Sequence, residues 1–82
     1  MNKNHFYELF GWVGTFLILL AYGLASFGWL SAESAVFQIM NIVGSAGLLT
    51  IALVKKVYQS VVINVVWALI GLVALAKIFF LI

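Results

Sequence analysis

The chain contains no cysteine, so a disulfide framework, a thiolate metal site and a cysteine nucleophile are excluded. It contains no proline either, so no helix carries the usual kink residue. Charged residues make up only 7% of the 82 positions, against about 25% in ordinary soluble domains. Four cations and two anions leave a formal net charge of +2, which is too small for us to expect nucleic acid as a partner.

Apolar residues, in contrast, make up 67% of the chain. A water-soluble domain of this size has little interior, so most of these side chains would lie on its surface and promote aggregation. A lipid bilayer removes that problem because it takes the place of water as the solvent. The composition therefore predicts a single transmembrane domain over residues 1–82, with membrane lipid as its surroundings.

Three long stretches are nearly free of charge: about residues 10–30, 35–54 and 57–82, with Lys77 the exception in the third. The first would be about 31 Å long as a helix, enough for a hydrocarbon core of about 30 Å. In lipid each segment must satisfy its own backbone hydrogen bonds, so each should be helical. The short breaks predict an all-α, integral membrane three-helix bundle that runs up, down and up. Ser31 is the expected N-cap of the second helix, with Glu33 near the positive end of its dipole.

A cleavable signal peptide is the alternative interpretation of the N-terminus, with Lys3 as its basic region and residues 10–20 as its apolar core. Glu8 does not fit such a region, and the apolar run continues to Leu30. We therefore expect the segment to be retained as a membrane span.

The positions of the lysines predict an orientation. Lys3, Lys55 and Lys56 fall on one side of a three-span protein, and only Lys77 falls toward the other. The positive-inside rule then predicts a multi-pass protein of the cell's inner (plasma) membrane, with a cytoplasmic N-terminus and the C-terminus outside. We expect Lys77 to extend its ammonium group to the outer interface instead of acting at membrane depth.

Each predicted helix carries one stripe of polar or small residues at helical spacing, within about 60–80° of arc. The stripes consist of Thr15, Tyr22 and Ser26; of Gln38, Asn41 and Ser45; and of Ser60, Asn64, Trp67, Gly71 and Ala74. Such residues normally avoid the lipid and point into a bundle or a cavity.

Two interpretations of these stripes remain open. In the first they pack the helices, with an amide hydrogen bond from Gln38 or Asn41 to Asn64, worth about 0.6 kcal/mol. In the second, Asn64 and Trp67 line a polar cavity, since an amide beside a flat aromatic face suits a polar solute such as a sugar. Three helices are too thin to enclose a pathway, so the cavity requires a homodimer, most simply with two-fold symmetry. Gly44, Gly47 and Gly71 would allow close approach of backbones.

Catalysis is not expected. His5, the only histidine, is followed three positions later by Glu8, and the ordinary explanation is a position at the membrane interface. Gly11 and Gly14 indicate helix packing and not a phosphate loop. We therefore predict no enzyme, no catalytic residue, no metal and no cofactor.

A longer pattern of small, polar and aromatic residues resembles an uncharacterised family of small bacterial three-span membrane proteins. It covers about residues 10–72 and consists of Trp12-x-Gly14, Ala21-Tyr22, Ser26-x-Gly28-x-Leu30-Ser31, Gln38-x-x-Asn41-x-x-Gly44-x-x-Gly47 and Asn64-x-x-Trp67. That family is in turn distantly similar to the PQ-loop and SemiSWEET group, whose members are three-helix bundles that dimerise around a solute cavity. The resemblance implies a SemiSWEET-like protomer, with Asn64 as the counterpart of an asparagine that flanks the sugar.

The chain also departs from that group. It lacks the proline-glutamine motif of the first helix, its predicted orientation is opposite, and Trp67 lies on a different helix from the transporters' tryptophan. Two function classes follow. The first is a dimeric transporter or facilitator of a small polar solute, with the expected binding residues Tyr22, Gln38, Asn41, Asn64 and Trp67. The second is a non-transporting module that binds a partner membrane protein or lipid, and a holin is a weaker third option.

Overall fold

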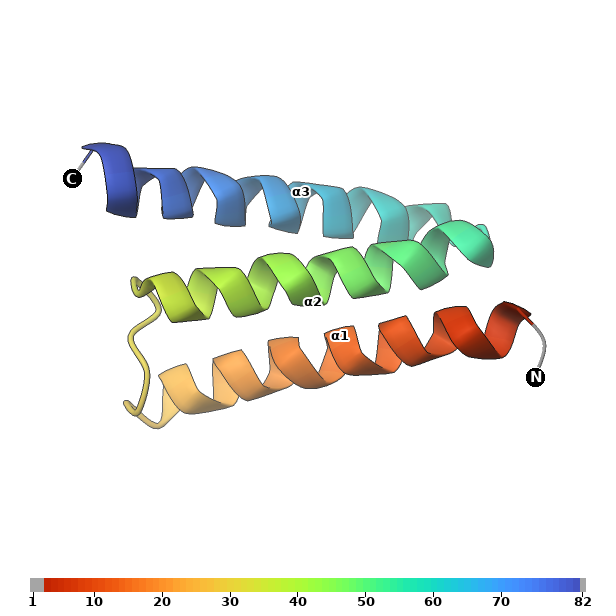
Figure 1. Ribbon diagram of the computed structural model, residues 1–82, viewed down its shortest axis with the longest axis horizontal. Coiled ribbons are helices and arrows are strands. Elements are labelled where there is room, and N and C mark those ends of the chain that lie inside the picture. The colour runs from red at the N-terminus through yellow and green to blue at the C-terminus, as the bar shows by residue number, and fades with distance from the viewer. Residues whose placement is uncertain (1–2, 82) are drawn as a thin grey trace.

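The computed structural model describes residues 3–81 and consists of helices joined by short turns. Helix α1 spans Lys3–Ser26, α2 spans Ala35–Val54 and α3 spans Tyr58–Ala76, and α3 continues into a π-helical segment, η1, at Lys77–Leu81. The three helices lie side by side and alternate in direction, with α2 in the middle (Figure 1). The predicted all-α three-helix bundle is confirmed.

All three helices are long and apolar enough to cross a membrane. The qualifying segments are His5–Ser26, Ala35–Val54 and Tyr58–Phe80. The longest dimension of the molecule is 44 Å, which matches a bilayer of about 40–45 Å including its headgroup regions. Most large apolar side chains lie on the outside of the bundle, as expected of a protein whose solvent is lipid.

The helix ends differ from the predicted spans at the first turn. Helix α1 ends at Ser26 and not near residue 30, because Gly28 adopts a φ of 79°, a left-handed conformation that ends helices. Helix α2 begins at Ala35 as predicted, but its N-cap is Ser34, whose hydroxyl accepts a hydrogen bond from the N–H of Phe37. The expected cap, Ser31, instead accepts from the N–H of Glu33 within the turn.

At the other end of α1, the helix starts at Lys3 instead of near residue 10, since no residue before Phe10 breaks it. Helix α3 begins at Tyr58, one residue after its predicted start. Its predicted end, at residue 82, lies outside the described residues.

Helix α2 carries the contacts of the bundle, with α1 packed on one flank and α3 on the other. The contact with α1 is a glycine seam: a Cβ atom at Gly14 would meet the carbonyl oxygen of Gly44, and one at Gly47 would lie 2.5 Å from the carbonyl oxygen of Phe10. Backbone therefore touches backbone along this seam, as the glycine spacing predicts. Against α3, a Cβ at Gly71 would lie 2.8 Å from Cγ1 of Ile42.

Candidate functional site

The two helices that flank α2 do not lie directly opposite each other around it. At 100° per residue, Gly44 lies about 20° around α2 from Phe37, which contacts Tyr22 of α1. Gln38 and Ile42, which face Gly71 of α3, lie about 100° and 140° from Phe37 on the opposite side from Gly44. Helices α1 and α3 therefore leave part of the surface of α2 uncovered, between the directions of Phe37 and Gln38.

Asn41 lies in that uncovered part, about 40° from Phe37 and about 60° from Gln38. We call this side of the bundle the polar face. It consists of Asn41 of α2, Thr15 and Tyr22 of α1, and Trp67 and Ala74 of α3. The opposite side carries Val43, Ala46 and Thr50 of α2, which line a shallow apolar hollow.

Two of the flanking residues come from α3. Gln38 lines a cavity together with Ala74, so Ala74 lies on the side of α3 toward the polar face. Trp67 is displaced from Asn64 in the same direction around α3, by about 60°. Trp67 therefore borders the polar face, although 44% of it is exposed and it also covers an apolar hollow beside Ile70.

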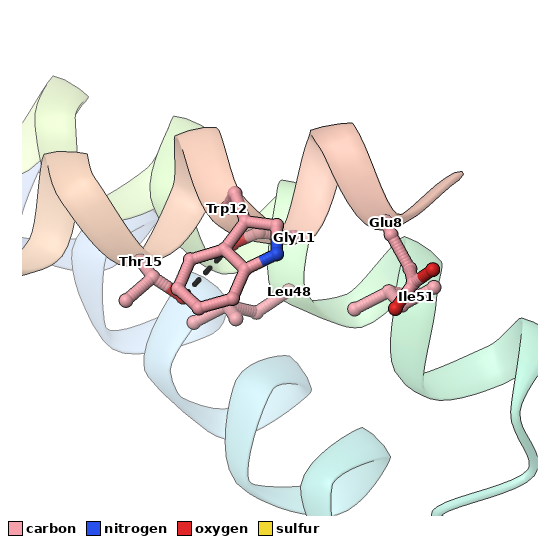
Figure 2. Close-up of a pocket in the computed structure, with 6 residues that line it drawn as sticks. All are labelled: Glu8, Gly11, Trp12, Thr15, Leu48 and Ile51. Atoms are coloured by element: carbon pink, nitrogen blue, oxygen red, sulfur yellow. Dashed lines mark hydrogen bonds between the residues drawn. The ribbon is translucent and has the colours of Figure 1, made fainter. Parts of the chain in front are cut away.

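Helix α1 contributes Thr15 and Tyr22 to the polar face. Figure 2 shows the hollow where α1 meets α2, with the indole ring of Trp12 lying across Thr15 and with Leu48 beneath. The hollow has a volume of about 210 Å³, and Glu8 lies at one end of it. The hydroxyl of Thr15 donates to the carbonyl of Gly11 at 2.8 Å, so it is satisfied by its own helix (Figure 2).

Three polar residues lie at the same depth, near the middle of the bundle. Gly14 meets both Gly44 and Leu48 of the antiparallel α2, so it is level with about residue 46, and the next residue of α1, Thr15, is level with Ser45. Asn64 comes seven residues before Gly71, or about 10 Å along α3, and this brings it level with about residues 45–49 of α2. Thr15, Ser45 and Asn64 therefore form a belt across the three helices.

Asn64 is buried, with 7% of its surface exposed, and its Nδ2 donates to the carbonyl of Ser60 at 2.8 Å. The side chain of Gln38 also bonds locally, since its Nε2 donates to the carbonyl of Ala32 at 3.0 Å. The expected amide bond between α2 and α3 is thus replaced, among the described residues, by bonds to nearby carbonyls. For Asn64 the cause is simple, because a carbonyl one turn away costs a short side chain little entropy to reach. Gln38 reaches a carbonyl six residues back, in the turn before α2.

Two further residues of the polar stripes are Tyr22 and Ser45. The ring of Tyr22, 40% exposed, packs edge-on against Phe37 with centroids 5.7 Å apart. The hydroxyl of Ser45 is fully buried and has no hydrogen-bond partner within residues 3–81. A buried hydroxyl without a partner is costly, so Ser45 marks a place where the protomer alone leaves a polar group unsatisfied.

Sequence reasoning missed one interaction at the end of the bundle. Lys55 pairs with Glu8 at 3.0 Å, from the end of α2 to the start of α1. The signal was present, because the two residues carry opposite charge and fall on the same side of a three-span protein.

A protein-family model matches residues 7–81, nearly the full length of the chain. No curated protein matches the chain, and no solved structure matches it. The match spans all three helices and every residue of the polar face. The chain therefore belongs to this uncharacterised family.

Proposed function

We propose that the chain forms a two-fold symmetric homodimer in the cell's inner membrane that moves a small polar solute across it, in the manner of SemiSWEET-like transporters. The observation that carries this proposal is the polar face. Four of the five residues expected to bind solute, Tyr22, Gln38, Asn41 and Trp67, lie on or at the border of one side of the bundle, and all three helices contribute. The fifth, Asn64, is buried between α2 and α3.

The roles follow from the positions of these side chains. Asn64 and Asn41 supply amide groups near mid-depth, where a solute loses its contact with water. Trp67 and Tyr22, each with about two-fifths of its surface exposed, offer flat aromatic surfaces from the two flanking helices. Gln38 lies closer to the membrane surface and would contact the solute as it enters or leaves.

A second copy is needed because the polar face is open. A polar group that faces lipid destabilises the protein. Two copies related by a two-fold axis would cover each other's polar faces and so remove these groups from the lipid. The lysine distribution favours a cytoplasmic N-terminus for both copies.

Solute flux into proteoliposomes tests this function, with a panel of sugars and small metabolites. Asn64→Ala should abolish flux of the transported compound, whereas Gln59→Ala, an exposed amide at the start of α3, should leave it unchanged. Flux that is absent across the panel for the native protein, or equal in both variants, would overturn the proposal.

The dimer can be tested separately, because the cysteine-free chain accepts a single reporter. Asn41→Cys on the polar face should crosslink two copies in membranes, whereas Val43→Cys on the opposite side should not. Crosslinking through Val43→Cys alone would place the dimer axis on the wrong side for a shared cavity.

The second candidate, a module that binds a partner membrane protein or lipid without transport, is favoured by one observation. Asn64 and Gln38 both donate to backbone carbonyls of their own chain, so neither amide needs a solute. This alternative predicts no flux for any solute and copurification of a specific partner that Asn41→Leu displaces.

A further inference from the structure

We infer that Glu33, Gln38 and Lys77 form a binding site for the headgroup of a phospholipid that carries a primary amine, such as phosphatidylethanolamine. These residues line a cavity of about 220 Å³ between the first turn and the end of α3, together with Ala32, Ala74 and Ile78. This site is separate from the belt at mid-depth, and it does not depend on whether a solute is transported.

The charges of the cavity match such a headgroup. Among residues 3–81, neither Glu33 nor Lys77 forms an ion pair with another side chain, so neither charge is neutralised by a neighbour. The ammonium group of Lys77 can bind the lipid phosphate, and the carboxylate of Glu33 can accept from the lipid ammonium. A choline headgroup has no N–H to donate and would lose the second interaction.

Gln38 adds an acceptor. Its Nε2 is held by the carbonyl of Ala32, and its Oε1 points toward α3, 3.6 Å from the position that a Cβ of Gly71 would occupy. The amide oxygen therefore lies at the α2–α3 contact, one turn of α3 from Ala74 in the cavity wall, and it can accept a hydrogen bond from a primary ammonium group. With Glu33 on the same side, the ammonium would have two acceptors.

An apolar groove continues from the cavity along α3, and this favours a lipid over a free zwitterion. The groove has a volume of about 370 Å³ and shares Ala74 and Lys77 with the cavity. Its other walls are Leu69, Ile70 and Val73, which are all more than half exposed. A polar cavity that opens into an apolar groove suits a molecule with a charged head and an acyl chain.

The site also lies at the right depth. Glu33 precedes the first residue of α2, and Lys77 lies three residues before the end of the third apolar span, Tyr58–Phe80. Both belong to the edge of the membrane, where headgroups lie.

Native mass spectrometry of the purified full-length protein, with equimolar phosphatidylethanolamine and phosphatidylcholine, tests the inference. The native protein should retain the amine lipid about tenfold more than the choline lipid, as expected for one additional hydrogen bond between charged groups. Glu33→Gln should lower this preference, because only neutral amide oxygens then accept from the lipid ammonium, whereas Lys77→Gln should lower the retention of both lipids. Lys77→Arg should restore retention, because it restores the cation.

Matched controls lie at the opposite end of the bundle: Glu8→Gln for Glu33 and Lys56→Gln for Lys77. Both should retain the lipids as the native protein does. Equal retention of the two lipids by the native protein would overturn the inference, and so would equal losses in the controls. Displacement of the lipid by an equal concentration of free phosphoethanolamine would show a site for a soluble zwitterion and overturn the assignment to lipid. The flux measurement with Asn64→Ala is independent of this lipid measurement, so the two proposals can fail separately.

Discussion

The ammonium group of Lys55 donates a hydrogen bond to Oε1 of Glu8 across 3.0 Å, and this ion pair closes the end of the α1–α2 hairpin. Both side chains are substantially exposed, at 46% and 36% of their surface. The pair lies at the end of the hairpin that holds the α2–α3 turn, where it links the start of α1 to the end of α2.

Reversing either charge of this pair should lower stability slightly, because two like charges would then face each other. Glu8→Lys and Lys55→Glu should each lower the thermal midpoint in detergent, and the double exchange should restore it. High salt should shrink the losses of both single variants. A double exchange no more stable than the single variants would show that the two groups do not interact.

Enlarging the glycine seam should separate α1 from α2. Gly14→Ala would direct a methyl group at the carbonyl oxygen of Gly44, so we expect a loss of about 1–3 kcal/mol in the free energy of unfolding. Gly23→Ala is the matched control, because a Cβ there meets nothing within 4 Å. It should raise stability by up to about 1 kcal/mol through helix propensity. Equal effects in the two variants would contradict a tight seam at Gly14.

Helix α2 should depend on its serine cap. Ser34→Ala removes the acceptor for the N–H of Phe37 and should cost about 1 kcal/mol, measured by reversible unfolding in mixed micelles. Ser31→Ala is the control at the other serine of the turn. It should cost less, because the carbonyl of Ser31, which accepts from Ser34, remains. The reverse order would place the start of α2 at Ser31 after all.

Removing the hydroxyl of Ser45 should not harm the protomer. In the free protomer this group is buried without a partner, so Ser45→Ala should raise the free energy of unfolding by about 1 kcal/mol or leave it unchanged. Thr50→Ala is a useful comparison, since the hydroxyl of Thr50 donates to the carbonyl of Ala46. A loss of stability in Ser45→Ala as large as that in Thr50→Ala would contradict the absence of a hydrogen-bond partner for Ser45 within residues 3–81.

The sequence predicts the helices well because membrane spans are set by one strong physical demand, the internal satisfaction of backbone groups. The start of α2 at Ala35 and its end at Val54 follow directly from that demand. The end of α1 does not, because Phe27, Trp29 and Leu30 are as apolar as the helix before them. Only the left-handed backbone of Gly28 ends it, and glycines occur inside these helices as well.

The arrangement of the helices is less accessible to sequence reasoning. All three helices carry stripes of small or polar residues, and nothing in these stripes indicates that α2 is central. The amide of Asn64 likewise has several reachable partners, and the choice of the Ser60 carbonyl over Gln38 or Asn41 depends on tertiary distances. The cavity of Glu33 and Lys77 joins residues 44 positions apart, so the sequence alone does not bring them together.

Because α2 carries the contacts to both other helices, each interface in the bundle joins segments that are adjacent in the chain. The hairpin of α1 and α2 can therefore form while α3 is still being synthesised, and α3 then docks on a surface that already exists. Such an order needs few long loop closures and favours rapid assembly. It also means that α1 and α3 make few contacts with each other. A change in the angle between them on the polar face would therefore break few contacts.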